Sequence, residues 1–519
     1  MKKPIIYNYL LLLGIFFFQA CAPSEEKAPR PNILFIMSDD HTAQAWGIYG
    51  GILKEHVKTP NIERLANTGT VLNNAFCTNS ICVPSRASIL TGQYSHRNGV
   101  YTLSDPLQPD SMNVAKLMKS NGYQTAIVGK WHLKKQPAGF DYFNVLPGQG
   151  RYHNPLLKTA DNWEDGSKGG QEHQGFSADV IADKSIEWLN QRAKDKPFFL
   201  MTHFKATHEP FDYPERYKDL YKDEEIPEPE SLLDFGPETT GRTFVGQKLE
   251  NMVARWQQAY EHPDTYWTSY PGLPFETAGL DSVQLRKKAY QKFVKDFMRC
   301  GAAIDDNIGK LLDYLAKEGL AENTVVVYTA DQGYFLGEHG FFDKRLIYEE
   351  SLRMPFVVCY PKEIPGGTRI DDLVLNIDFP ALFLDYAGIK KPESIQGRSF
   401  RQNLKGQTPQ DWRKSVYYRY WQHYPARPAH FGLRNDRYKL AFFYGQALDM
   451  SGSGKETTEP AWEFYDLEKD PKELHNAYQD SEYQDVIKEM KEELLAQRQE
   501  FGDTDAQYPV MQEIMEKYW

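Results

Sequence analysis

Cysteine is scarce in this chain of 519 residues, which has five cysteines and no C-x-x-C pair. That rarity excludes a disulfide scaffold and gives no sign of a cysteine-based zinc site. Concentrated positive charge is also missing, because the 60 lysines and arginines are spread along a chain whose formal net charge is −11. Binding of nucleic acid through a large basic face is therefore not expected. Hydrophobic residues at 41% and charged residues at 25% are typical of a globular, enzyme-sized protein with ample core.

A hydrophobic run long enough to span a membrane is missing at the N-terminus, where the apolar stretch covers only residues 5–18. Because two lysines precede it, residues 1–20 are interpreted as a signal peptide. Residues 18–21 resemble a bacterial lipoprotein box that would place a lipid on Cys21, and ordinary cleavage after Ala22 is the alternative. Residues 21–30, rich in Pro, Ser, Glu and Lys, form a tether. We expect an exported protein, in the periplasm or at the outer membrane or cell surface of a Gram-negative bacterium, whose membrane contact is limited to that lipid.

Apolar runs of strand length alternate with helical patterns from residue 31 onward. Runs that are apolar on both faces indicate buried parallel strands, and the alternation favours an α/β sheet covered by helices on both sides. The predicted strands are residues 32–37, 124–128, 197–202 and 324–329, and the predicted helices are residues 59–68, 179–193 and 294–318.

Each predicted strand leads directly into polar side chains of the kind found in active sites. The carboxyl ends of parallel strands meet at one edge of a sheet, where ligands bind. Four such endings favour one shared active site over four unrelated polar loops. In chain order the endings supply Asp39 and Asp40, then Lys130 and His132, then His203 and His208, and finally Asp331 and Gln332.

A metal site is indicated by four of these residues, Asp39, Asp40, Asp331 and Gln332. They offer only oxygen ligands, which suit a hard cation such as calcium better than zinc. Helix capping is the alternative for an Asp-Asp pair after a strand. The second pair, at the end of another strand, argues against it.

The strongest local signal surrounds Cys82. Pro84 suits the first turn of a helix, and the residues after it look helical until Gly92. Cys82 would then lie at a helix N-terminus, where free N–H groups and the helix dipole favour an anion. A buried free thiol beside a helix start is the alternative. However, Cys82-x-Pro84-x-Arg86 with a following Thr-Gly pair resembles the signature of the type I sulfatases, which convert this cysteine to formylglycine.

The resemblance extends from residue 31 to the C-terminus. It implies an alkaline-phosphatase-like fold: a large mixed, mostly parallel sheet sandwiched by helices, with a smaller C-terminal α+β subdomain built on an antiparallel sheet. We place the catalytic domain at residues 31–395 and the subdomain, with a terminal helix, at residues 396–519. Besides the cysteine motif, the blocks that match in order are residues 39–40, 129–132, 205–208, 331–333, 337–340 with Lys344, 348–355, 378–388 and 463–471.

The same resemblance implies a role for each site residue. Formylglycine made from Cys82 attacks sulfur beside one calcium ion, and Arg86 braces that group and the helix start. Lys130 binds a sulfate oxygen, and His132 takes the proton that allows sulfate to leave. His208 and Lys344 lie on the leaving-group side, with His208 the general acid. The implied ligands of calcium are Asp39, Asp40, Cys82, Asp331 and Gln332, the last replacing the asparagine of many sulfatases.

The spacing of Lys130 and His132 supports their joint role, and other histidines and lysines have structural interpretations. Lys130 and His132 lie two apart in an expected extended segment, so both can face the same side. His203 and His339 are interpreted as structural histidines. For Lys344 the alternative is a solvated loop lysine, with Arg345 as its rival.

Two regions are candidates for substrate specificity. Residues 209–281, rich in Pro, Tyr and Trp, form an insertion after His208 that could roof the pocket. Residues 417–444 alternate aromatic and polar side chains through two expected strands. Their cationic side chains suit an anionic sugar, and a packed sheet with solvated arginines is an equal alternative. The side chains in question are His423, Arg427, His430 and Arg434.

The expected function is hydrolysis of a sulfate ester on a sugar, by an exo-type enzyme of glycosaminoglycan or mucin glycan breakdown. The segment from Lys344 to Pro355 looks most like enzymes of the N-acetylglucosamine-6-sulfatase type. The expected partners are a sulfated mono- or oligosaccharide and a maturase that makes formylglycine. A phosphodiesterase or phosphonate monoester hydrolase with the same nucleophile is one alternative, and a non-catalytic glycan-binding protein is the other.

Overall fold

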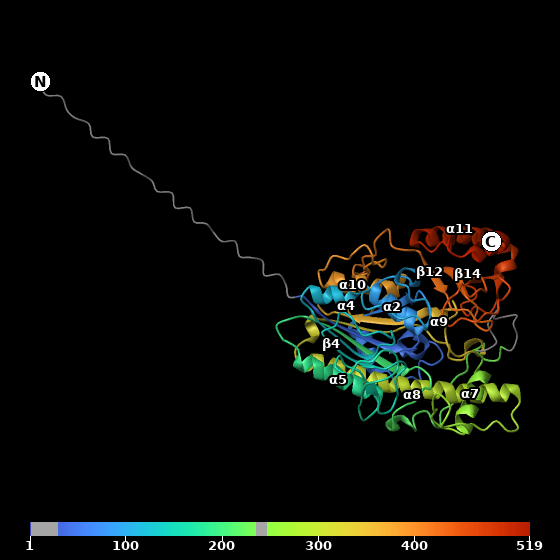
Figure 1. Cartoon of the computed structure of the whole chain (residues 1–519), viewed down its shortest axis with the longest axis horizontal. Coiled ribbons are helices and arrows are strands. Elements are labelled where there is room, and N and C mark those ends of the chain that lie inside the picture. The colour runs from blue at the N-terminus through green and yellow to red at the C-terminus, as the bar shows by residue number, and fades with distance from the viewer. Residues whose placement is uncertain (2–29, 235–246) are drawn as a thin grey trace.

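The computed structural model describes Met1, residues 30–234 and residues 247–519 (Figure 1). The rest of the predicted signal peptide, Cys21 and residues 22–29 of the tether lie outside the described residues. In the part of the chain that is described, no helix is both long enough and apolar enough to cross a membrane.

A nine-stranded sheet forms the centre of the molecule. Eight strands follow one another in the order β10-β2-β9-β8-β1-β7-β3-β4, and β11 pairs with β2. β9 runs antiparallel to its neighbours β2 and β8, and the other pairs are parallel. The predicted mixed, mostly parallel sheet is confirmed. Its strands are β1 (Asn32–Asp39), β2 (Thr70–Phe76), β3 (Gln124–Lys130), β4 (Tyr142–Leu146), β7 (Phe198–Thr207), β8 (Thr324–Ala330), β9 (Arg353–Cys359), β10 (Thr368–Ile370) and β11 (Val374–Leu375).

Helices cover both faces of this sheet. The side chains of β1 alternate between two hydrophobic clusters: Ile33 and Phe35 belong to one, and Leu34 and Ile36 to the other. The continuous apolar run from Ile33 to Met37 therefore contributes to two cores at once. Figure 1 shows α5 and α8 on one side of the sheet and α2, α4 and α10 on the other. Their bounds are α1 (Pro60–Thr68), α2 (Cys82–Thr91), α4 (Val114–Ser120), α5 (Ser177–Gln191), α8 (Ser282–Lys317) and α10 (Phe379–Tyr386).

Helix α8 begins twelve residues before the predicted start at residue 294. Asp281 caps it by accepting a hydrogen bond from the N–H of Gln284 at 2.8 Å, and the Gln284 side chain accepts from the N–H of Asp281 in return. This reciprocal capping box marks the true start. The inserted segment that leads to this helix contains α7 (Leu249–Glu261), which packs against α8.

A second, antiparallel sheet follows near the C-terminus, as predicted. Its four strands pair in sequence order, and α11 packs across three of them. Residues 417–444 contain three strands instead of the expected two, because a tight turn after Asn435 splits the second run. One hydrophobic cluster joins this sheet to the large one, so the boundary at residue 395 stays a prediction. The elements are β12 (Ser415–Tyr420), β13 (His430–Asn435), β14 (Tyr438–Phe443), β15 (Ala461–Asp466), α11 (Gln484–Phe501) and α12 (Pro509–Tyr518).

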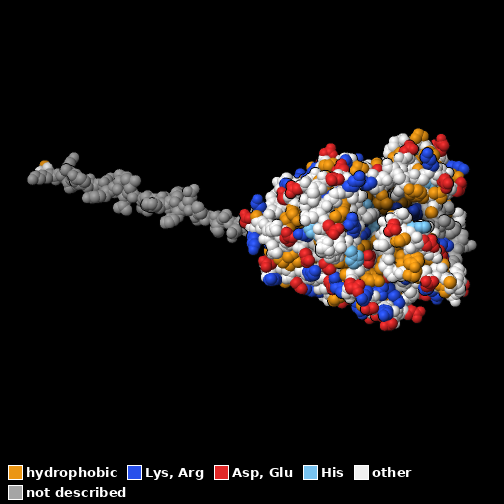
Figure 2. Space-filling view, turned by 60° about the horizontal axis from the view of Figure 1, so that its bottom comes forward, with side chains coloured by type: hydrophobic (Ala, Val, Ile, Leu, Met, Phe, Trp, Pro, Cys, Tyr) orange, Lys and Arg blue, Asp and Glu red, His pale blue; other side chains and the backbone are white. Residues whose placement is uncertain are grey.

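The surface carries mixed charge. On the face shown in Figure 2, acidic and basic side chains alternate over the whole area, without a continuous basic surface on that face. This distribution agrees with the even spread of lysine and arginine along the sequence.

Candidate active site

The four predicted strands lie side by side in the order β8-β1-β7-β3, all parallel. Their carboxyl ends therefore meet at one edge of the sheet. This brings together Asp331 after β8, Asp39 at the end of β1, His208 after β7 and Lys130 at the end of β3. The predicted convergence of strand endings is confirmed.

Cys82 is the first residue of α2, as expected. The helix ends at Gly92, which adopts φ 67° and donates its N–H to the Ser88 carbonyl at 2.8 Å. Cys82 is 1% exposed, and burial raises the pKa of its thiol to about 11. Its sulfur lies 3.4 Å from Lys344 Nζ and 3.8 Å from Gln332 Nε2. The cysteine is thus a protonated thiol near neutral pH, surrounded by the predicted site residues.

Arg86, one turn further along α2, connects the helix to two strand ends. Its Nε donates to Asp331 Oδ2 at 2.9 Å, and its Nη1 donates to the Lys130 carbonyl at 2.8 Å. Nη2 lies 3.7 Å from Asp39 Oδ1. Arg86 is 2% exposed and the two aspartates are fully buried, so the ion pairs are shielded from solvent.

Each of the three aspartates has a cationic partner. Lys130 Nζ contacts Asp39 Oδ2, and Arg86 holds Asp331. Lys344 Nζ donates to both oxygens of Asp40 at 2.5 and 2.6 Å. Burial raises the pKa of Asp40 to about 6, and Lys344 opposes that rise. In formal charge the three pairs cancel, while burial and the neighbouring cations hold the pKa of Lys130 well below its usual value.

The same aspartates offer the ligand oxygens of a cation site. Asp39, Asp40 and Asp331 each offer a carboxylate oxygen, and these oxygens lie within 4.8 Å of one another. Both oxygens of Asp39 and Oε1 of Gln332 are buried and accept no hydrogen bond of normal geometry from the described residues. Carboxylate and amide oxygens that are buried together fit a hard divalent cation.

His208 and His132 flank the site. His208 Nε2 lies 4.0 Å from Asp40 Oδ2, and its Nδ1 donates to the Glu209 carbonyl at 2.7 Å. Burial, with Lys130 and further cations nearby, holds the pKa of both histidines well below the usual value. The expectation of an extended segment is wrong at His132, which adopts φ 59° in the left-handed region. The chain turns there, and Nδ1 of His132 is buried without a hydrogen bond to the described residues.

Sequence reasoning missed two side chains that hold the lysines. Gln149 accepts a hydrogen bond from Lys130 Nζ at 2.6 Å, and it lines a cavity of about 200 Å³ together with His132. Gln247 donates to the carbonyl of Lys344 at 3.0 Å. Isolated glutamines in loops carry no sequence signal for such roles. Lys344 itself is 3% exposed, which excludes the alternative of a solvated loop lysine.

The other histidines and arginines that the sequence singled out make contacts within the protein itself. His203 is buried and donates from Nδ1 to the Lys130 carbonyl at 3.1 Å, and His339 stacks on Tyr348 at 5.2 Å. Both agree with the structural interpretation. In the second sheet the side chains pair with the protein itself: His423 with Glu456, Arg427 with Asp343, His430 with Pro428 and Arg434 with Glu349.

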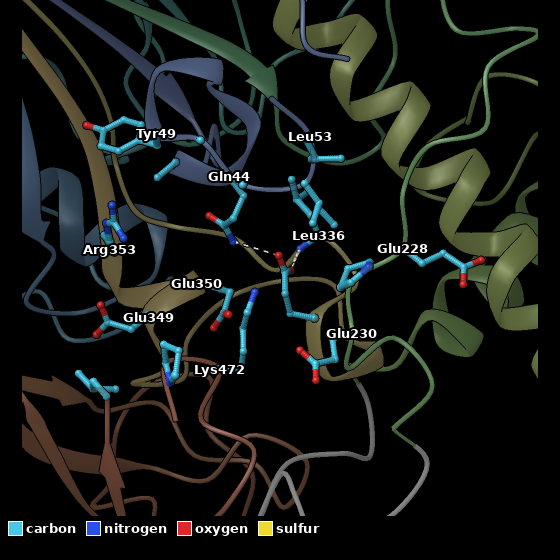
Figure 3. A pocket seen from close by; sticks show the side chains of 18 of the residues that line it. Gln44, Tyr49, Leu53, Glu228, Glu230, Leu336, Glu349, Glu350, Arg353 and Lys472 are labelled. Carbon is cyan, nitrogen blue, oxygen red and sulfur yellow. Dashed lines mark hydrogen bonds between the residues drawn. The ribbon is translucent and has the colours of Figure 1, made fainter. Parts of the chain in front are cut away.

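A larger cavity of about 640 Å³ lies apart from these residues (Figure 3). Gln44 and the N–H of Leu336 donate to Glu338 inside it, at 3.5 and 2.6 Å. Carboxylates outnumber cations along its wall, and none of the predicted catalytic or metal-binding residues lines it, although the specificity candidate Arg434 does. An anionic substrate would be repelled there, so the chemistry belongs to the strand ends and not to this cavity.

Comparison with known proteins decides the family. The sequence model of the sulfatase family matches residues 31–389. The chain belongs to the sulfatase family. A further model, N-sulphoglucosamine sulphohydrolase, C-terminal, matches residues 337–500. This sulfatase is therefore a hydrolase of sulfate esters, and the resemblance seen in the sequence is confirmed.

Relatives cover nearly the whole sulfatase. An N-acetylglucosamine-6-O-sulfatase of Bacteroides thetaiotaomicron is 37% identical, over 96% of this chain and 91% of the relative. A solved structure of a protein in complex with its substrate, D-glucosamine-2-N,6-O-disulfate, is 35% identical with a TM-score of 0.82, covering 92% of this chain and 100% of that one. A phosphonate monoester hydrolase from Silicibacter pomeroyi is 20% identical with a TM-score of 0.68, covering 91% and 96%, and shares the fold.

Proposed function

We propose that this sulfatase removes the 6-O-sulfate from a glucosamine residue at the end of a glycosaminoglycan or mucin-type glycan. The observation that carries the proposal is the strand edge itself, where Cys82, three buried carboxylates and two lysines meet. The choice of sugar rests on the 37% identity to an N-acetylglucosamine-6-O-sulfatase and on the similar structure bound to a 6-O-sulfated glucosamine.

Cys82 is the proposed site of formylglycine, made by a maturase that reads Pro84 and Arg86. Once hydrated, that group supplies two hydroxyls on one carbon, one to attack sulfur and one to expel sulfate. The unmodified side chain is poorly suited to the task, because burial raises the pKa of the thiol to about 11. Its contact with Lys344 places position 82 beside a permanent positive charge.

Calcium is the proposed metal, held by Asp39, Asp40, Asp331 and Gln332 together with the modified residue at position 82. A bound divalent cation supplies Lewis-acid stabilisation of sulfate oxygens. Without it, the negative charges of the carboxylates and the formal positive charges of their partners cancel. A divalent ion would make the pocket positive, as an anionic ester requires.

His208 is the proposed acid for the leaving sugar oxygen, and His132 the proposed base for sulfate release. Lys344 is the poorer acid, because Asp40 raises its pKa and keeps it an ammonium. Burial and the nearby lysines keep His208 neutral in the free enzyme. The anionic ester is the group whose charge favours protonation of His208, so the acid forms when substrate is bound. Lys130 and Lys344 would hold sulfate oxygens.

The remaining proposals concern location and specificity. We place residues 1–20 as an export signal that directs the enzyme to the cell envelope, with a lipid on Cys21. Within the inserted residues 209–281, the part around Trp267 is proposed to flank the sugar, because Trp267 is 59% exposed and adjoins Tyr270, which bonds to the neighbour of His208.

A panel of position-defined substrates tests the proposed function. Purified enzyme, matured in a host that makes formylglycine, is offered sugars sulfated at single positions, together with phosphodiesters and phosphonate monoesters. Release of sulfate from 6-O-sulfated glucosamine derivatives, well above all other substrates, is expected. Preference for another sulfated position would overturn the choice of sugar, and faster turnover of a phosphonate monoester would overturn the sulfatase chemistry.

A further inference from the structure

The inserted segment between β7 and α8 contacts Glu209, the neighbour of His208, and the main chain of Lys344. Three of its side chains make these contacts, and they come from a stretch of residues 247–270 that includes α7. We call Gln247, Arg255 and Tyr270 the brace. Arg255 lies at the middle of this helix, Gln247 precedes the helix, and Tyr270 follows it.

The His208 ring is oriented by the main chain of its neighbour. Nδ1 donates to the Glu209 carbonyl at 2.7 Å, and since a carbonyl can only accept, the proton is on Nδ1. The carbonyl of His208 accepts from the hydroxyl of Tyr152. Nε2 is thereby left free to point at the site, 4.0 Å from Asp40 Oδ2. Any shift of Glu209 would tilt the nitrogen that serves the leaving oxygen.

Two members of the brace fix Glu209. Arg255 Nη1 donates to Glu209 Oε2 at 2.6 Å, and the Tyr270 hydroxyl donates to Oε1. The Glu209 side chain is 11% exposed, so these bonds are largely shielded from water. A carboxylate held at both oxygens has little freedom to rotate, and its backbone carbonyl is held with it.

The third member holds the loop of Lys344. Gln247 is fully buried and donates from Nε2 to the carbonyls of Lys344 and Phe342, at 3.0 and 3.3 Å. The N–H of Phe342 donates to the Gln247 carbonyl at 2.8 Å. Arg255 also lies over the Phe342 ring, 5.0 Å from its centroid. One segment thus contacts the supports of both His208 and Lys344.

We propose that the brace positions the leaving-group side of the active site, with Arg255 and Tyr270 acting through Glu209 on His208 and with Gln247 acting on Lys344. The proposal rests on the proposed role of His208 as acid. Loss of the brace should therefore slow departure of a poor leaving group far more than binding of the sulfate. A sugar alkoxide needs protonation by a correctly placed acid, whereas an activated aryl oxide needs little.

The test compares Arg255→Met, Arg255→Lys and Tyr270→Phe with wild type on a 6-O-sulfated glucosamine and on 4-nitrophenyl sulfate. For Arg255→Met and Tyr270→Phe, kcat for the sugar sulfate should fall by roughly tenfold or more, with KM within about twofold and with kcat for the aryl sulfate within about threefold. Arg255→Lys keeps a cationic donor and should recover much of the loss.

Arg216→Met is the matched control. Arg216 lies in the same insertion and pairs with Asp179 of α5 and Asp306 of α8, at 2.8 and 3.1 Å, and neither aspartate belongs to the site described above. It should leave both substrates unaffected. Tyr270→Phe removes a single hydroxyl, so it stays informative if Arg255→Met fails to fold, as judged by circular dichroism.

Equal losses on both substrates, or the same pattern in Arg216→Met, would overturn the brace. Unchanged sugar-sulfate kcat in both Arg255→Met and Tyr270→Phe would do so as well. Failure of the proposed function appears separately, because wild-type enzyme would then release no sulfate from the sugar while the aryl sulfate still reports a working site.

Discussion

Replacing Arg86 with methionine should destabilise this sulfatase more than any exposed ion-pair substitution. Arg86 is 2% exposed, and its guanidinium bonds to the fully buried Asp331 at 2.9 Å and to the Lys130 carbonyl at 2.8 Å. Methionine keeps most of the volume and removes the charge and every donor. The change therefore leaves the buried Asp331 carboxylate without its cationic partner and takes one of two donors from the Lys130 carbonyl, which keeps His203 Nδ1.

The size of the effect follows from these contacts. An uncompensated buried charge costs about 3–5 kcal/mol, and loss of one hydrogen bond at a carbonyl that keeps another donor costs about 0.5–1.5 kcal/mol. The Asp331 carboxylate keeps one donor, the Asp40 N–H at 3.1 Å, which moderates the loss. We expect Arg86→Met to lose about 4 kcal/mol of unfolding free energy, a large share of the roughly 5–15 kcal/mol of a folded protein.

Urea titration followed by tryptophan fluorescence measures that loss. Arg216→Met is the control, because its ion pair is 40% exposed on the arginine side and should contribute about 0–1 kcal/mol. Adding Asp331→Asn to Arg86→Met should restore stability, since the buried charge is then gone. A loss below about 1 kcal/mol in Arg86→Met, or no recovery in the double variant, would refute the reasoning.

Three further predictions concern metal, acid–base roles and pH. Chelation should abolish turnover and lower the unfolding temperature, and calcium should restore both better than zinc; full activity of metal-free protein would contradict the proposed oxygen ligands. His208→Ala should slow sugar-sulfate turnover by about a hundredfold or more and an aryl sulfate less, whereas His132→Ala should slow both alike; identical profiles for the two variants would reverse the assignment. Burial lowers the pKa of His339 to about 3, whereas the pKa of a histidine in the unfolded chain is about 6.5. The unfolded chain therefore binds a proton first as pH falls from 6.5 toward 3, and the folded protein loses about 1.4 kcal/mol of stability per pH unit. His339→Asn should therefore lose less stability than wild type between pH 7 and pH 5.5 in urea titrations, and an unchanged pH dependence would contradict a neutral buried histidine.

Much of the fold could be predicted because the buried strands have a recognisable apolar pattern in the sequence. Buried parallel strands need apolar side chains on both faces, and β1 and β8 carry them in the runs 33–37 and 325–328. Their polar endings then fall at the ligand-binding edge by geometry alone. The position of β9 could not be predicted this way, since an antiparallel strand within a parallel sheet has the same apolar composition.

Contacts between residues that are far apart in the sequence could not be predicted from local sequence patterns. Glu209 meets Arg255 across 46 residues and Tyr270 across 61. A glutamate after a histidine and an arginine on a helix are ordinary residues, so their pairing is visible only in the folded chain. The turn at His132 was missed for another reason: a positive φ at a non-glycine residue has only a weak signature in sequence.

The chemical state of position 82 is the most direct test of the mechanism. Tandem mass spectrometry of a peptide that spans residues 80–86, taken from enzyme with measured sulfatase turnover, should show the mass deficit of an aldehyde in place of the Cys82 thiol. Cys77, buried nearby and followed by neither proline nor arginine at the motif spacing, should remain a thiol in the same sample. Cys82→Ala should be folded and inactive. Robust sulfatase turnover by protein whose Cys82 is entirely an unmodified thiol would contradict the account.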